Sequence, residues 1–157
     1  MLVQKRKLRV LLFASNPDAT TLHDANGEPQ LPRLTSLALV AIARWDLYAH
    51  GLAESGFPLE AIFCVNGPLG PDLVRELCAL KSLELLSAVG LEVDDDGAKA
   101  IATSLTSLTS LYLWDNRVGD DGAKAIATSL TSLTSLYLGK NQVGDEGVKA
   151  IAASLIS

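Results

Sequence analysis

The 157-residue sequence is poor in cysteine, methionine and aromatic residues. It has two cysteines, one methionine and 5% aromatic residues. Cys64 and Cys78 each lie in a short apolar run, so we expect reduced core thiols and no disulfide framework. No apolar run approaches the roughly 18 residues of a membrane-spanning helix, and the stretch 10–14 is too short for a signal-peptide core. We therefore expect a cytoplasmic protein, with secretion as an effector left open.

Positive charge is also scarce. The chain carries 13 Lys and Arg against 18 Asp and Glu, a net charge of −5. A nucleic-acid-binding domain typically needs a basic face, and the one basic cluster, Lys5, Arg6, Lys7 and Arg9, is most simply the solvated flank of a strand. We expect neither a nucleic-acid partner nor a membrane partner.

Sequence motifs of catalysis and of cofactor binding are missing as well. The sequence has no Gly-rich phosphate loop and no GxSxG, HExxH or CxxC pattern. The acidic run 94–96 lacks the spaced ligands of a calcium loop, so we interpret it as helix capping. The sequence predicts a non-enzymatic protein with no catalytic residue, no cofactor and no metal.

The sequence contains enough hydrophobic residues for the core of one domain, and its C-terminal part is built of repeated segments. Hydrophobic residues make up 48% of the chain, which indicates a folded domain. Segments 93–117 and 118–142 match at 21 of 25 positions, and a third copy starts at Val143. Gly97, Gly122 and Gly147 mark the 25-residue period. Such a period is typical of a stacked repeat architecture.

Each repeat combines two hydrophobic periods. Ala98, Ile101, Ala102 and Leu105 follow the i, i+3, i+4, i+7 pattern of a helix. Asp95-Asp96, like Asp120-Asp121, is expected to supply the N-cap of that helix and favourable charge at its positive end. Leu111 and Leu113 alternate as in a short strand, and such units stack as right-handed crossovers between parallel strands. Asn116 and Asn141, just after each strand, are expected to hydrogen-bond the backbone of neighbouring turns.

These residues carry a family resemblance. The segment LTSLYLWDNRVGDDGAKAIA resembles the leucine-rich-repeat pattern, followed by a helix similar to the ribonuclease-inhibitor-like subclass. Similar repeats form the sensor arms of NOD-like receptors and parts of some bacterial effectors. The resemblance covers 93–157 and weakens toward Leu80, where Ala88 and Leu91 replace the pattern's Leu and Asn. It implies an α/β solenoid with a curved parallel sheet, outer helices and a protein-binding role.

The N-terminal third shows alternating elements without a clear repeat. We predict strands at 8–14 and 59–65, a helix of about twenty residues from Leu34, and a helix bearing Leu73, Leu77 and Leu80. Leu11 and Ile62 are 51 residues apart, which we interpret as one βα unit of double length that caps the solenoid. The predicted organisation is a capping unit over 1–58 and a leucine-rich-repeat solenoid over 59–157.

An alternative interpretation places chemistry in this N-terminal part. The polar loop 15–24 follows the first strand, where ligands often bind in open α/β sheets, and Asp18, His23 and Asp24 could form an acid–base or metal cluster there. Residues 1–60 would then be a signalling or enzymatic domain and the repeats a targeting arm. His50, on the polar side of the predicted long helix, is a weaker candidate.

The predicted binding surface is the sheet face turned away from the helices. Tyrosine and tryptophan are common at interface hot spots, although Tyr112 and Tyr137 are equally explained as a structural stack across strands. By register, the positions on this face are Ser110, Tyr112 and Trp114, then Ser135, Tyr137 and Gly139, and further back Leu85, Ser87 and Val89, then Ala61, Phe63 and Val65. The charged or polar residues expected to follow the strands at its rim are Asp115, Arg117, Lys140 and Gln142.

The last repeat suggests a further interaction. With no polar cap after the third helix, its strand would be an open edge and its helix would expose apolar residues, and both invite association. We therefore expect a possible homodimer through residues 134–157, or a chain that is a fragment of a longer repeat array.

Overall fold

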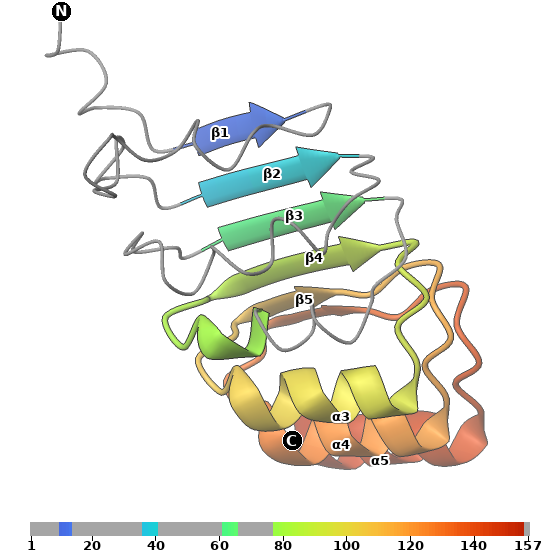
Figure 1. The fold of residues 1–157 in the computed structure, drawn as a ribbon. Helices are drawn as coiled ribbons and strands as arrows, with labels where there is room; N and C mark the ends of the chain where they lie inside the picture. The colour runs from blue at the N-terminus through green and yellow to red at the C-terminus, as the bar shows by residue number, and fades with distance from the viewer. Residues whose placement is uncertain (1–9, 14–35, 41–60, 66–76, 156–157) are drawn as a thin grey trace, which may run out of the picture.

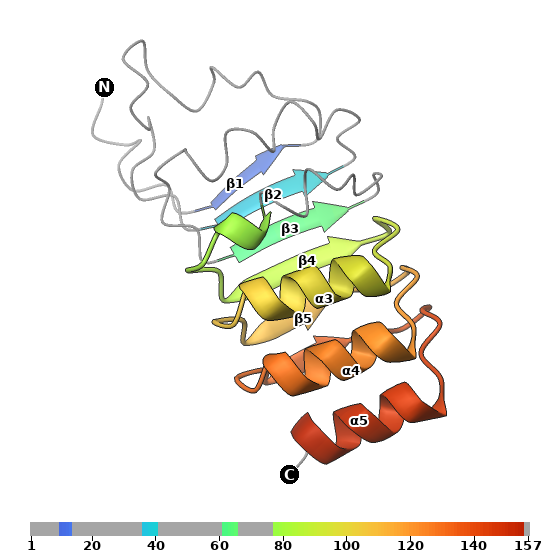
Figure 2. The same cartoon turned by 60° about the horizontal axis from the view of Figure 1, so that its bottom comes forward.

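The computed structural model describes residues 10–13, 36–40, 61–65 and 77–155. Its strands form one parallel six-stranded sheet in chain order, and α3, α4 and α5 lie side by side along one face of its C-terminal part (Figures 1 and 2). The strands are β1 (Val10–Phe13), β2 (Ser36–Val40), β3 (Ala61–Val65), β4 (Leu85–Val89), β5 (Ser110–Tyr112) and β6 (Ser135–Tyr137), and the helices are α3 (Asp95–Ser104), α4 (Asp120–Ser129) and α5 (Asp145–Leu155).

The register of the sheet confirms the predicted repeat. Leu86 pairs with Leu111, and Leu111 pairs with Leu136, in neighbouring parallel strands. Leu86 of β4 and Leu111 of β5 are fully buried, as are Ala98 and Ile101 on the inner face of α3. One continuous apolar core runs from Ile62 to Leu130 between the sheet and the helices. Because a fully buried leucine contributes roughly 1.5–3 kcal/mol, stacking supplies stability that one repeat could not reach alone.

The N-terminal part corrects one prediction. Residues 36–40, expected at the start of a long helix, form β2, which pairs with β1 on one side and β3 on the other. Leu11, Leu37 and Ile62 are therefore aligned in adjacent strands, 26 and 25 residues apart. The prediction of one βα unit of double length was wrong, because the segment between Leu11 and Ile62 consists of two ordinary repeat lengths. A short apolar run such as SLALV fits the hydrophobic period of a helix as well as that of a strand. The pattern therefore predicted a helix where the structure has a strand.

The other N-terminal predictions have mixed outcomes. The strands expected at 8–14 and 59–65 are confirmed as the shorter β1 and β3. Residues 77–79 are helical, as expected for the helix bearing Leu77. The remainder of the predicted long helix, residues 41–52, lies outside the described residues. The sheet continues across the expected boundary between 58 and 59, but the division into a capping unit and a solenoid stays a prediction.

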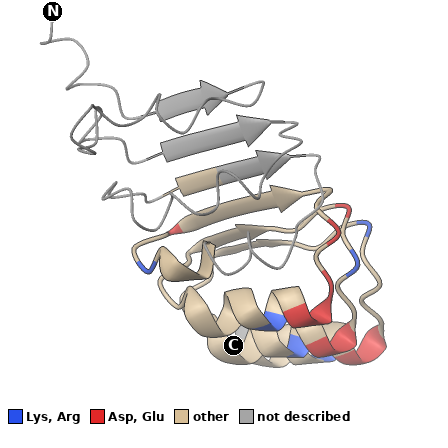
Figure 3. Ribbon diagram, in the orientation of Figure 1, with Lys and Arg blue, Asp and Glu red and all other residues tan. Residues whose placement is uncertain are grey.

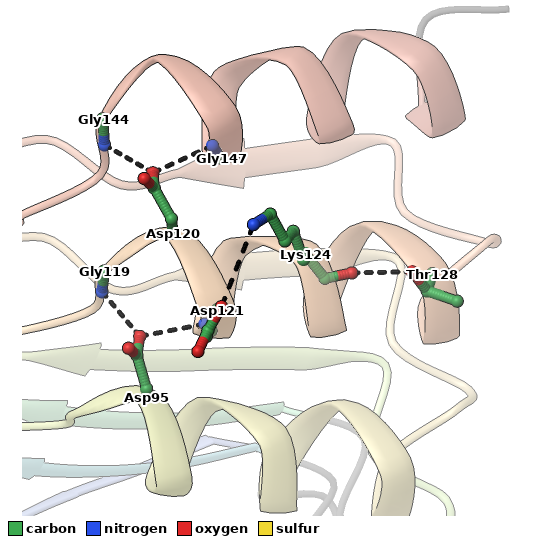
Figure 4. Close-up of polar contacts among 9 residues, drawn as sticks. Asp95, Gly119, Asp120, Asp121, Lys124, Thr128, Gly144 and Gly147 are labelled. Carbon is green, nitrogen blue, oxygen red and sulfur yellow. Dashed lines mark hydrogen bonds and ion pairs between the residues drawn. The ribbon is translucent and has the colours of Figure 1, made fainter.

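The helix caps differ from the prediction in an informative way. The N-cap of α3 is Asp94, whose carboxylate accepts a hydrogen bond from the Gly97 amide. Asp95, expected to cap its own helix, instead accepts from the amides of Gly119 and Gly122 in the next repeat, at 2.7 and 2.9 Å (Figure 4). Asp120 makes the same pair of contacts to Gly144 and Gly147 at the start of α5. Each carboxylate thus ties one helix start to the next, where a negative charge also favours the positive end of the helix.

Candidate protein-binding face

The sheet face turned away from α3, α4 and α5, called the open face below, carries the predicted row of side chains. In β5 and just beyond it, Leu111 and Leu113 are fully buried, whereas Tyr112 is partly exposed and Trp114 is exposed. Ser110 and Ser135 are partly exposed at the start of their strands, and Tyr137 is exposed in β6. In β4 the row is interrupted because Ser87 is buried. The described exposed row therefore belongs to β5 and β6.

Tyr112 and Tyr137 form a stack across these two strands. Their ring centroids are 4.7 Å apart and the ring planes differ by 10°, because the residues are register partners in the sheet. The structural explanation of this pair is therefore confirmed. Stacking also holds both rings in place, so that little side-chain entropy remains to be lost on binding a partner.

Trp114 lies over Gly139, which holds the equivalent position in the turn after β6. A Cβ atom on Gly139 would overlap the Trp114 ring, so only glycine leaves space for the indole. The ammonium group of Lys140 lies over the same ring, 5.6 Å from its centroid, within the range of a cation–π interaction. Trp114 is still 43% exposed and Tyr137 is 53% exposed.

The turns between strands and helices, residues 89–94, 114–119 and 139–144, form a charged margin called the strand-to-helix edge below. Many of the described charges lie there and in the first turns of the helices (Figure 3). The predicted rim residue Arg117 forms an exposed ion pair with Glu92, at 3.1 Å. Asp115 and Lys140 are exposed at equivalent positions of their turns, both with left-handed backbone angles, φ 60° and 54°. An exposed ion pair such as that of Arg117 with Glu92 adds little stability.

Asn116 and Asn141 hold these turns together, as the sequence predicts. The buried side chain of Asn116 accepts hydrogen bonds from the amides of Leu91 and Val93, both at 3.0 Å, and donates one to the Ala88 carbonyl at 2.7 Å. Asn141 accepts from Val118 and donates to the Leu113 carbonyl one repeat later. The amides satisfy backbone groups that would otherwise be buried unpaired, and so they fix the margin of the open face.

The remaining candidates are placed only in part. Ala61, Phe63 and Val65 lie in β3 in register with Leu85, Ser87 and Val89, but the Phe63 side chain lies outside the described part. The loop 15–24, with Asp18, His23 and Asp24, and His50 also lie outside it, so the alternative site there stays a prediction. Within the described ranges no group of three or more His, Cys, Asp or Glu side chains could hold a metal ion.

Two further features concern reactivity and membranes. Cys78 is a free thiol; burial raises its pKa, while a hydrogen bond from Ser104 and the charge of Lys81 act in the opposite direction. A raised pKa keeps the thiol protonated and unreactive at neutral pH. None of the described helices is long and apolar enough to cross a bilayer.

Sequence reasoning missed two parts of this arrangement, the capping of α4 and α5 by the preceding repeat and the fit of Trp114 over Gly139. The first had a signal, because Asp95 and Asp120 precede glycines at identical spacings of 24 and 27 residues. The sequence also contained a signal for the second, because one repeat has Trp114 where the next, nearly identical repeat has Gly139.

Comparison with known proteins supports the fold and the nature of the repeats. Residues 104–127 and 129–152 match a family model described as leucine-rich repeat. An internalin from Listeria monocytogenes is similar over 78% of this chain and 34% of its own, with 21% identity and a TM-score of 0.58. A leucine-rich-repeat protein from Leptospira interrogans is similar over 98% of this chain and 37% of its own, with 21% identity and a TM-score of 0.63.

The chain thus spans about a third of the length of these two proteins, and at this identity the likeness shows the fold alone. No curated protein has a significantly similar sequence. The matched segments coincide with the near-identical repeats that build β5, α4, β6 and α5. The family model matches two repeats of the chain, and the solved structures share its fold, a parallel sheet with helices along one face as in leucine-rich-repeat solenoids.

Proposed function

We propose that the chain is a non-catalytic module that binds a protein partner through the open face of β5 and β6. The observation that carries this proposal is the exposure of Trp114, just after β5, and of Tyr137, in the adjacent strand β6, on the same sheet face. Leucine-rich-repeat proteins typically mediate protein–protein interaction. Large aromatic side chains on a rigid support bury much area at a small entropic cost, as interface hot spots do.

The wider surface belongs to the same proposal. Ser110 and Ser135 would supply polar contacts beside the tyrosines, while Asp115, Arg117 and Lys140 would form a charged rim around the aromatic centre. The helix opposite each described C-terminal strand supports an assignment to the ribonuclease-inhibitor-like subclass. A cytoplasmic location also remains part of the proposal, and the free thiol of Cys78 supports it.

The test is capture of the partner from the native host by the immobilised chain. The double variant Tyr112→Ala, Trp114→Ala should weaken binding at least about 100-fold, because two hot-spot residues are each worth about 2 kcal/mol. The control variant Thr103→Ala, Thr128→Ala changes two exposed threonines on the helix side and should bind normally. Thermal unfolding of each variant separates lost binding from lost folding. Equal capture by a folded aromatic variant would refute the proposal.

The last repeat favours a second interaction, the homodimer through residues 134–157. Val148 is 57% exposed, although Ala98 and Ala123, its counterparts in the two preceding repeats, are fully buried. Leu136 and Leu138 are only partly buried, and in the described sheet β6 pairs on one side only. Apolar surface beside a sheet edge favours association.

We therefore expect light scattering at micromolar concentration to give a dimer mass, and expect Val148→Asp to shift the population toward monomer. A wild-type chain that stays monomeric throughout this range would rule the homodimer out.

A further inference from the structure

The two near-identical repeats differ at four positions, and all four lie on the strand-to-helix edge. The differing pairs are Asp94 and Gly119, Trp114 and Gly139, Asp115 and Lys140, and Arg117 and Gln142. The strand positions before these turns and the helix positions after them are the same in both repeats. Whatever distinguishes one repeat from the other is therefore confined to this margin of the open face.

Packing accounts for two of the four differences. Gly139 leaves the space that the Trp114 ring occupies. At position 119 the backbone amide donates to Asp95, and a Cβ atom there would lie 3.1 Å from the same carboxylate. A side chain at either position would have to displace a neighbour, so these glycines are explained by the way one repeat packs on the next.

The other two differences change only the charge of exposed side chains. Arg117 pairs with Glu92, whereas Asp115 has no ion-pair partner among the described residues. Lys140 extends over Trp114 and forms no salt bridge with Asp115. Apart from Arg117, which is paired with Glu92, the turn after β5 thus offers one negative charge and the turn after β6 one positive charge.

The backbone does not favour these side chains. Asp115 and Lys140 occupy the position that Gly90 holds in the preceding repeat, and all three have left-handed backbone angles, φ 60°, 54° and 66°. Glycine adopts this conformation freely, while other residues adopt it at a cost, which is greater for lysine than for aspartate. The charges at 115 and 140 are therefore present despite the turn geometry. The contact of Lys140 with Trp114 offsets part of this cost, but Asp115 makes no ion pair among the described residues, and this points to a use outside the fold.

We propose that Asp115 and Lys140 make binding selective for the order of one basic and one acidic side chain in the partner. The occupant is an extended polypeptide segment that crosses β5 and β6 beside Trp114 and Tyr137, with a basic side chain at Asp115 and an acidic side chain at Lys140. This inference rests on the proposed function, since the aromatic residues supply the affinity and the charge pair supplies the selectivity.

The dimensions of a sheet restrict the partner further. Neighbouring strands are about 4.8 Å apart, and same-side residues of an extended chain are about 6.5–7 Å apart. Because successive side chains of an extended chain point to opposite sides, the two charges in the partner are two positions apart in its sequence. The exposed rings of Trp114 and Tyr137 then take an aromatic or aliphatic residue next to the charged pair.

The experiment is selection of random 12-residue peptides, displayed on phage, by the immobilised full chain. Three proteins are compared: wild type, the charge-swapped variant Asp115→Lys, Lys140→Asp, and the aromatic variant Tyr112→Ala, Trp114→Ala. Wild type should enrich peptides with one basic and one acidic residue at the spacing above, beside an aromatic or aliphatic residue. The charge-swapped variant should enrich peptides with the opposite charge order relative to that residue.

Affinities of synthetic peptides complete the test. A wild-type-selected peptide should bind the charge-swapped variant at least about tenfold more weakly, and a peptide with its two charges exchanged should recover that loss. Both residue types already occur at this turn position, so the swap should fold normally, and the single variants Asp115→Asn and Lys140→Gln give the same comparison with a smaller change.

The outcomes separate the inference from the proposal beneath it. Peptides that need Tyr112 and Trp114 but show no charge order, or whose order is unchanged by the swap, overturn the inference and leave the binding face intact. Peptides that bind wild type and the aromatic variant equally, or no enrichment at all, overturn both.

Discussion

Replacing Asn116 with alanine should lower the free energy of unfolding by about 3–5 kcal/mol. The buried amide accepts two backbone hydrogen bonds and donates one to the Ala88 carbonyl. Alanine would leave the amides of Leu91 and Val93 buried without an acceptor, and each unsatisfied group costs about 1–3 kcal/mol. Urea denaturation followed by circular dichroism measures the loss.

Asn141→Ala is the matched control for this variant. Asn141 makes contacts of the same kind to the Val118 amide and the Leu113 carbonyl, but its side chain is only partly buried, so water can replace part of what is lost. We expect about half the effect. Two equal and small losses, below about 1 kcal/mol, would show that the asparagines do not hold the turns as described.

The second large effect concerns the close packing of helix starts. Gly122→Ala should destabilise the fold by about 2 kcal/mol, the usual scale for overpacking. A Cβ atom there would lie 2.7 Å from Asp95 Oδ1, 2.9 Å from Val118 Cγ1 and 3.0 Å from Ala98 Cβ. Three neighbours would have to move, and one of them is the carboxylate that caps α4. The melting temperature and the urea midpoint should both fall.

Gly97→Ala provides the control at the equivalent position of α3. A Cβ atom there would contact only Val93 Cγ1 at 3.1 Å and Asp94 Oδ1 at 3.5 Å. Alanine is also the better helix residue, by roughly 0.5–1 kcal/mol, which offsets the tighter contact. We expect little net change. A loss at Gly97 as large as that at Gly122 would contradict the role given to the preceding repeat.

The sequence alone was sufficient for the C-terminal repeats, and there are physical reasons why. Near-identical copies must have near-identical environments, so one helical face and one strand alternation are enough to place Leu111 and Leu136 in adjacent strands. The asparagines after the strands were predictable for the same reason, since their position in the period assigns them to neighbouring turns.

The remainder was harder because it depends on contacts between repeats. Residues 36–40 fit a helix and a strand equally well, and only pairing with β1 and β3 makes them a strand. Asp95 lies where a cap of its own helix is expected, yet the neighbouring helix start is close enough to take the carboxylate. The position of Trp114 depends on the missing side chain of Gly139, in the equivalent turn of the next repeat.

Hydrogen exchange of the chain with and without its captured partner tests the central claim most directly. The binding face is expected to be β5, β6 and the turns after them, so amide protection on binding should increase in 110–117 and 135–142 and stay unchanged in α3, α4 and α5. Protection confined to the helices, with exchange in β5 and β6 unaltered, would contradict the account.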